Sequence, residues 1–194
     1  MTPGRGAALV LALVLAVATA RVDADPASTK QAPRFGFGRA ATAAEIRAWD
    51  IDVRPDGAGL PPGRGTVAQG AAVYAAKCEA CHGAAGRNGP FDALVGREPR
   101  AGFPFGRDPS LVRTVGNYWP YATTLYDYIH RAMPWMQPGS LEPDEVYGLV
   151  AYLLFLNEIV REDAVMDAVT LPKVVMPAHD RFVRDNRRGG REIR

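Results

Sequence analysis

Three stretches of the chain space their apolar residues at intervals of three and four, the pattern of a helix with one buried face. The first covers residues 66–80. The second covers residues 123–133 and ends before Pro134, because a residue that precedes proline is driven out of the helical region. The third begins at Glu142, where Pro143 fits the first turn and acidic neighbours face the positive helix end. Its buried stripe would contain Val146, Leu149, Val150, Leu153, Leu156 and Val160.

Glycine and proline interrupt the segments outside these helices. Residues 82–117 predict a loop that wraps over a rigid object, and residues 25–65 predict an extended arm whose prolines break any long helix. Thr42 is placed to start a short helix inside this arm, because Ile46 and Trp49 follow at helical spacing. No internal repeat and no alternating strand pattern is visible, so the pattern predicts an all-α fold.

The length of the chain allows one compact core with extensions. With 194 residues, 47% of them hydrophobic, it is too short for two independent cores. We expect a core domain over residues 66–162, preceded by the arm over residues 25–65 and followed by a C-terminal arm over residues 163–194. Disordered linkers seldom carry many apolar residues. We therefore expect both arms to bind a partner rather than complete the core, through Ile46, Trp49, Ile51, Val53, Leu171, Val174 and Met176.

The first twenty residues have the features of a secretory signal peptide. Arg5 precedes an apolar run over residues 7–18, and the small residues 18–20 fit a cleavage site. The run is shorter than the roughly 20 apolar residues that a membrane span needs. We expect a signal peptide over residues 1–20, with cleavage as late as residue 24, and a mature protein that is soluble in the periplasm.

The charge of the chain is close to balanced. A formal net charge of +2 gives no electrostatic support for nucleic-acid binding by the whole molecule. The positive excess is local and suggests a solvated tail, with a docking surface as the alternative. It comes from Arg181, Arg184, Arg187, Arg188, Arg191 and Arg194.

The two cysteines carry the strongest chemical signal. An exported protein with two cysteines suggests a disulfide, but Cys78 and Cys81 are three residues apart and His82 follows at once. This CxxCH spacing lets two thiols add to the vinyl groups of a haem while the imidazole reaches the iron. A thioredoxin-like redox pair would need a βαβ context, and a zinc site would need two further ligands. The sequence therefore predicts one covalent haem c and a single-haem class I cytochrome c domain.

The iron needs two axial ligands, and His82 is the first. A hydrogen-bond acceptor on its other ring nitrogen fixes the tautomer and strengthens the ligand. The Pro90 carbonyl is the candidate acceptor, although an ordinary turn proline is an equal alternative.

A methionine thioether as the sixth ligand would raise the reduction potential. Met133 is favoured because it ends a predicted helix before Pro134, and Met136 is the alternative. Met166 and Met176 follow the last helix and are expected to pack or to lie in the tail. His130 falls off the apolar stripe of its helix, which indicates a surface imidazole rather than a ligand.

Small and aromatic residues suggest how the first and last helices meet. Gly70 and Tyr74 on the first and Tyr152 on the last predict a close crossing, in which the glycine admits an aromatic ring of the opposing helix. Three further aromatic residues are candidates for the core or the haem edge, where their polar ends could reach a propionate. These are Tyr118, Trp119 and Tyr121.

Several stretches resemble the SoxD-type cytochrome subunits of the sulfane dehydrogenases of bacterial thiosulfate oxidation. The likeness covers most of the mature chain and is more specific than CxxCH alone. Cytochrome subunits of sulfite dehydrogenases look similar. The stretches that carry the resemblance are residues 44–57, 116–125, 144–147, 156–160 and 171–172.

The resemblance implies a complex with a molybdenum-cofactor subunit that oxidises sulfur carried on a partner protein. This chain would take the electrons one at a time and pass them to a redox acceptor such as another cytochrome c. No acid, base or nucleophile is needed in this chain, and no catalytic residue is expected. A free electron carrier and a haem sensor or peroxidase are the alternatives, but the long arms favour a subunit of a larger enzyme.

Overall fold

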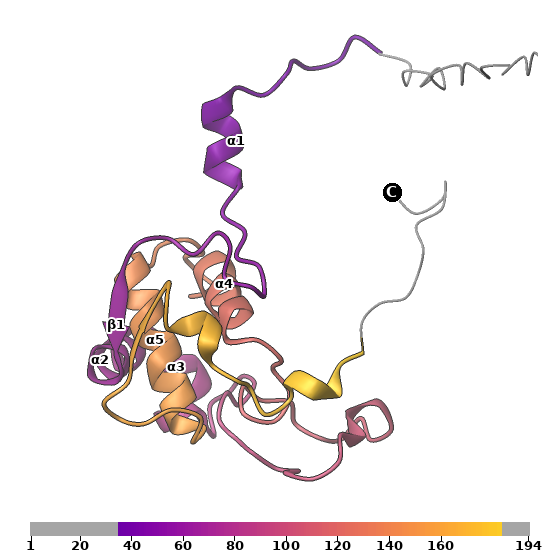
Figure 1. Ribbon diagram of the computed structural model, residues 1–194, viewed down its shortest axis with the longest axis vertical. Helices are drawn as coiled ribbons and strands as arrows, with labels where there is room; N and C mark the ends of the chain where they lie inside the picture. Colours follow the sequence, from indigo (N-terminus) through magenta and orange to yellow (C-terminus); the bar gives the residue numbers. More distant parts are fainter. Residues whose placement is uncertain (1–34, 184–194) are drawn as a thin grey trace, which may run out of the picture. The chain divides into compact units, whose positions relative to one another are not determined.

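The computed structural model describes residues 35–183 (Figure 1). The predicted signal peptide, the beginning of the N-terminal arm and most of the arginine-rich tail lie outside these residues. The described residues divide after Ala40 into two units. Every helix and strand described below belongs to the second unit. Within the described range, no helix has the length and apolar character needed to cross a membrane.

The predicted helices are confirmed. They form α2 (Val67–Lys77), α4 (Ala122–Ala132) and α5 (Pro143–Leu156), with the short helix α1 (Ala43–Trp49) in the N-terminal arm. Short helical turns complete the set: α3 (Glu79–His82), η1 (Ala84–Gly86), η2 (Pro104–Gly106), η3 (Leu171–Lys173) and η4 (His179–Arg181).

Local capping explains where the main helices begin. Thr42 caps α1 and Thr66 caps α2, each by accepting a hydrogen bond from the amide three residues later. At α5, the Glu145 side chain accepts from the Glu142 backbone amide over 3.0 Å. The predicted α5 stripe holds as far as Leu153, but the helix ends at Leu156, so Val160 lies beyond it.

The predicted helical fold also contains one small two-stranded sheet. The strand β1 (Arg64–Thr66) pairs antiparallel with β2 (Val165–Asp167), and Gly65 lies opposite Met166. Each strand has three residues, too few for an alternating pattern to stand out in the sequence. The pair joins the N-terminal arm to the C-terminal segment beside α5.

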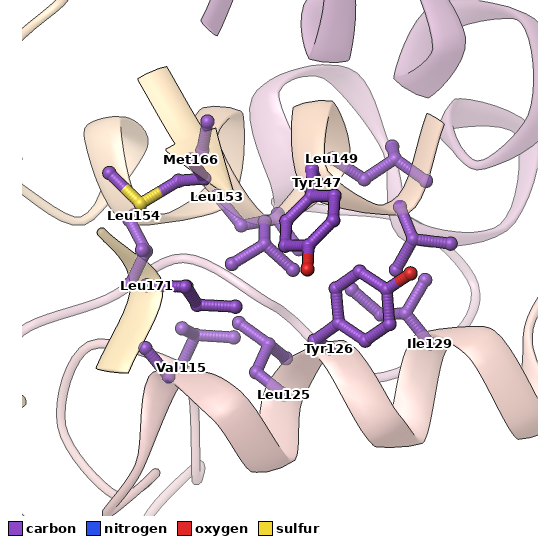
Figure 2. Close-up of a cluster of buried hydrophobic side chains, with 14 of the residues drawn as sticks. Val115, Leu125, Tyr126, Ile129, Tyr147, Leu149, Leu153, Leu154, Met166 and Leu171 are labelled. Atoms are coloured by element: carbon purple, nitrogen blue, oxygen red, sulfur yellow. The ribbon is translucent and has the colours of Figure 1, made fainter. Parts of the chain in front are cut away.

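The core lies between α4 and α5 (Figure 2). Leu125, Tyr126 and Ile129 of α4 face Tyr147 and the leucines of α5 in this view. Leu171 and Met166 join them from the C-terminal segment, and both are buried. Because α2, α4 and β2 all contact α5, this helix is buried around most of its circumference.

The close crossing of α2 and α5 is confirmed, but its contact differs from the expected one. A Cβ atom on Gly70 would collide with the backbone of Gly148, so this glycine admits the opposing main chain rather than a ring. The aromatic contact lies one turn further along, where the rings of Tyr74 and Tyr152 are 5.4 Å apart.

Both arms take part in the core, which corrects the expectation that they lie outside it. Val53, Leu171 and Met176 are buried in the core cluster, and Val174 packs against it. Ile46 and Trp49 of α1 are exposed, as a partner-binding segment requires. Of the predicted anchors, Ile46 and Trp49 of α1 and the half-buried Ile51 therefore lie outside the core cluster, and their binding to a partner stays a prediction.

Candidate functional site

The CxxCH motif lies at the junction of α2 and α3. Cys78 ends α2, where its amide donates to the Tyr74 carbonyl over 2.9 Å, and its own carbonyl accepts from the amides of Cys81 and His82 at 3.1 and 3.0 Å. Gly83 follows with a φ of 77° and ends the turn. One helical turn thus carries both thiols and the imidazole, as a covalent haem requires.

The imidazole of His82 is held by a backbone carbonyl, but not by the predicted one. Its Nδ1 lies 2.8 Å from the carbonyl oxygen of Asp92, so the Asp92 carbonyl takes the place predicted for that of Pro90. With a carbonyl as acceptor, Nδ1 carries the hydrogen and the lone pair of Nε2 is free for a metal ion.

The path of the following loop explains this choice of acceptor. Gly89 packs against the backbone of Cys81 and Gly83 so closely that no Cβ atom would fit. The Phe91 amide then donates to the Cys81 carbonyl over 3.1 Å. This contact brings the next residue, Asp92, alongside the imidazole.

Both cysteines are free thiols, Cys78 half-buried and Cys81 exposed. Burial raises the pKa of the Cys78 thiol to about 11, so this thiol is protonated at neutral pH. Reactive redox pairs have depressed thiol pKa values. The site is therefore unlike that of a dithiol oxidoreductase. Over residues 35–183, no group of three or more His, Cys, Asp or Glu side chains is placed to hold a metal ion.

The two candidate methionine ligands have different surroundings. Met133 ends α4, where its amide donates to the Ile129 carbonyl over 3.0 Å, and its half-buried side chain packs against the core. Met136 is 86% exposed and lies beside Trp135, which is also exposed. Burial favours Met133 as the sixth ligand, which stays a prediction.

His130 is not the surface imidazole that its position off the apolar stripe indicated. Its Nδ1 is buried and has no hydrogen-bond partner among the described residues, and the same holds for the hydroxyl of Tyr126. The two rings lie 5.9 Å apart. The residue as a whole is half-buried, although it lies off the apolar stripe of α4.

The three aromatic residues before α4 have separate roles. Trp119 packs against the core and donates from Nε1 to the Thr124 hydroxyl over 3.0 Å. The ring of Tyr121 lies 5.2 Å from that of His179. Tyr118 belongs to a cluster that the sequence analysis missed, in which it contacts Phe103, Phe105 and Phe182.

A buried amide anchors the long loop to the end of α5. Asn157 accepts from the Gly96 amide over 2.9 Å and donates to the carbonyls of Leu94 and Leu153. Arg97 donates back to the Asn157 carbonyl. The loop after His82 is thus fixed to the end of α5, which lies far from the motif in the sequence.

The residues of the site fit a haem. Two thiols and an imidazole share one turn, Nδ1 of His82 is engaged so that Nε2 is free, and a half-buried thioether lies at the end of α4.

Comparisons with known proteins agree with this fit. The family described as cytochrome C oxidase, cbb3-type, subunit III matches residues 65–153. A search of curated proteins finds no match. Among solved structures, the chain is similar to one in the crystal structure of the sulfane dehydrogenase SoxCD from Paracoccus pantotrophus. The two are 40% identical with a TM-score of 0.69, and the likeness covers 79% of this chain and 73% of that chain. It therefore extends beyond residues 65–153.

Proposed function

We propose that this chain accepts electrons one at a time from the catalytic subunit of a sulfane dehydrogenase. The chain belongs to the SoxD-type family of cytochrome c subunits of these enzymes. The predicted family and the class I cytochrome c fold are confirmed by the similarity to the SoxCD chain and by the cytochrome family match. These matches also support a haem-binding, electron-transfer role in sulfur oxidation. The covalent attachment, the ligands, the partner and the location are proposals.

The observation that carries the proposal is the motif turn with its oriented imidazole. Cys78 and Cys81 would form the two thioether bonds, and His82 would ligate the iron through Nε2 while Nδ1 donates to the Asp92 carbonyl. The sequence has two cysteines, so it can hold one covalent haem. When bound, the haem supplies an iron centre that takes up and releases a single electron.

Met133 would be the second axial ligand. Its thioether favours the reduced state of the iron and so raises the potential. With His82 and Met133 both bound, no position is open to oxygen or peroxide, which favours electron transfer over peroxidase or sensor chemistry. The half-buried side chain of Met133 would also limit the access of water.

The family resemblance suggests the partner and the compartment. We propose a complex with a molybdenum-cofactor subunit, in which electrons leave the substrate in pairs and pass through this chain singly to an acceptor such as another cytochrome c. The predicted signal peptide over residues 1–20 supports a periplasmic location. The exposed apolar residues of α1 favour a subunit of a complex over a free carrier.

Ligand variants of the holoprotein test this assignment. Met133→Ala should abolish the weak near-red absorption band of methionine-ligated iron and lower the midpoint potential, whereas Met136→Ala should leave both unchanged. The reverse result would move the ligand to Met136. Mass measurement of the denatured protein should find one haem attached, and a haem lost to acidified organic solvent would contradict covalent attachment.

Purification from the native host tests the partner. The chain should elute with a second subunit and with molybdenum in the same fraction. Elution of the haem-loaded chain alone, with molybdenum elsewhere, would favour a free carrier.

A further inference from the structure

Tyr74 connects the helix pair to the haem-attachment turn. It lies one helical turn before Cys78, and its side chain is 2% exposed. Its hydroxyl donates a hydrogen bond of 2.9 Å to the carbonyl of Gly83, the residue directly after His82. We propose that the Tyr74 hydroxyl is a positioning group for His82, which sets the orientation of the imidazole through the backbone of Gly83.

The backbone around Gly83 has little freedom to move independently. A Cβ atom on Gly83 would collide with the Arg87 carbonyl and the Gly89 amide, so two stretches of main chain are in direct contact there. The Gly83 carbonyl also accepts from the Gly86 amide over 3.1 Å. A group that fixes Gly83 therefore fixes the start of the loop that leads to Asp92.

The hydroxyl is itself held by a rigid frame. Its ring packs on that of Tyr152 in α5, with the ring centres 5.4 Å apart and the planes inclined by 55°. The main chains of α2 and α5 meet nearby, where a Cβ atom on Gly70 would collide with the backbone of Gly148. Burial raises the pKa of Tyr74 to about 12, which keeps the phenol a neutral donor at physiological pH.

The expected consequence concerns the hydrogen bond between His82 and Asp92. Its geometry depends on both the turn that carries His82 and the loop that carries Asp92, and Gly83 joins the two. A well-aligned bond makes the imidazole a stronger electron donor and so favours oxidised iron. This inference rests on the proposed role of His82 as an axial ligand.

Matched phenylalanine variants isolate the hydroxyl. Tyr74→Phe keeps the ring contact and removes the donor to Gly83. Tyr152→Phe is the control, because it alters the same ring pair but its hydroxyl makes no hydrogen bond within the described part of the chain. Covalent haem is first confirmed in all three proteins from the absorption of the denatured samples.

Two measurements on the reduced and oxidised holoproteins then test the inference. Nitrogen-15 NMR should show the His82 Nδ1 proton exchanging with water about threefold to tenfold faster in Tyr74→Phe, as expected when one net hydrogen bond is lost. The midpoint potential should rise in the same variant. Tyr152→Phe should match the wild type in both.

The outcomes separate this inference from the proposed function. Unchanged exchange and potential in haem-loaded Tyr74→Phe, or equal changes in Tyr152→Phe, would overturn the positioning role alone. A Tyr74→Phe chain that fails to fold would also overturn it, because the hydroxyl would then serve the whole fold. Absence of covalent haem from the wild type would refute the proposed function and this inference with it.

Discussion

The N-terminal arm contains two adjacent segments that behave in opposite ways. Helix α1 has no buried residue, and its Ile46 and Trp49 are 54% and 84% exposed. The strap, defined as residues 50–66, follows directly and buries Val53 in the core. The segment with the larger apolar side chains is therefore the one left uncovered.

Polar side chains of α4 and α5 account for the difference. Asp127 accepts from the Val53 amide over 2.8 Å, and Thr123 donates to the Pro55 carbonyl over 3.0 Å. Further along the strap, α5 supplies the partners. Tyr147 donates to the Pro61 carbonyl at 2.9 Å and Asp144 accepts from the Arg64 amide at 2.7 Å. These contacts satisfy the backbone of an extended segment that has few neighbours of its own.

Helix α1 satisfies its backbone differently. The Thr42 and Glu45 capping box ties its first turn, and the Asp50 amide donates to the Ile46 carbonyl at its end. A helix of seven residues is marginal in water without tertiary contacts. The comparison indicates that the strap belongs to the cytochrome fold, whereas α1 buries no residue against it.

Truncation at two points gives the largest expected effect. A chain that begins at Asp50 should have the same urea midpoint of unfolding as a chain that still contains α1, because α1 contributes no buried residue. A chain that begins at Val67 should lose about 6 kcal/mol, from about 2 for burying Val53 and about 1 for each of the four hydrogen bonds described above. Equal midpoints for both truncations would contradict the distinction between strap and helix.

Two alanine variants sharpen the comparison at single residues. Val53→Ala should reduce the free energy of unfolding by about 2 kcal/mol, because it removes buried methyl groups and leaves a small cavity. Trp49→Ala removes a far larger side chain yet should stay within about 0.5 kcal/mol of the wild type, since the indole is exposed. Urea unfolding of the haem-loaded proteins measures both, and a larger loss for Trp49→Ala would mean that α1 is packed in solution.

The sequence predicted the features that depend on interactions between neighbouring residues. The helices followed from apolar spacing, and the start of α5 followed from Pro143 and its acidic neighbours. The spacing of Cys78, Cys81 and His82 indicated a shared haem-attachment segment, and the structure places the three residues on one helical turn. These features depend on residues close together in the chain.

Features set by distant contacts were missed. The pairing of β1 with β2 joins segments about a hundred residues apart, and neither shows a strand pattern by itself. The acceptor for His82 depended on the path that Gly89 imposes on the loop. The partial burial of His130 depended on how α4 packs in the folded chain, because this residue lies off the apolar stripe of its helix.

Trp49 should matter for partner affinity, although it does not matter for stability. If α1 docks on the dehydrogenase subunit, Trp49→Ala should weaken the complex by at least about tenfold, because buried aromatic anchors dominate interface energies. Val175→Ala is a control, as Val175 is also exposed and apolar but lies outside α1. Calorimetric titration of the two subunits measures the affinities. A loss of less than twofold for Trp49→Ala, with its haem spectrum unchanged, would remove α1 from the interface.

The smallest expected effect concerns the bond between Tyr147 and the strap, and it depends on pH. Burial, together with the nearby Asp167 carboxylate, raises the pKa of Tyr147 from its ordinary value of 10.0 to about 12. The folded state therefore holds the phenolic proton more tightly than the unfolded state. The stability linked to this proton is fully present below pH 10 and falls as the pH rises from about 10 to about 12.

Tyr147→Phe tests this linkage. At pH 7 to 9 the variant should be less stable than the wild type by about 1 kcal/mol, the net value of the lost hydrogen bond to the Pro61 carbonyl. Above pH 10 this difference in the free energy of unfolding should become smaller, because only the wild type loses the stability linked to the Tyr147 proton. Other effects of alkaline pH act on both proteins. Urea unfolding at closely spaced pH values measures this difference. A stability difference that stays constant up to pH 12 would mean that the Tyr147 phenol ionises with its ordinary pKa. It would also mean that the strap detaches before the core unfolds.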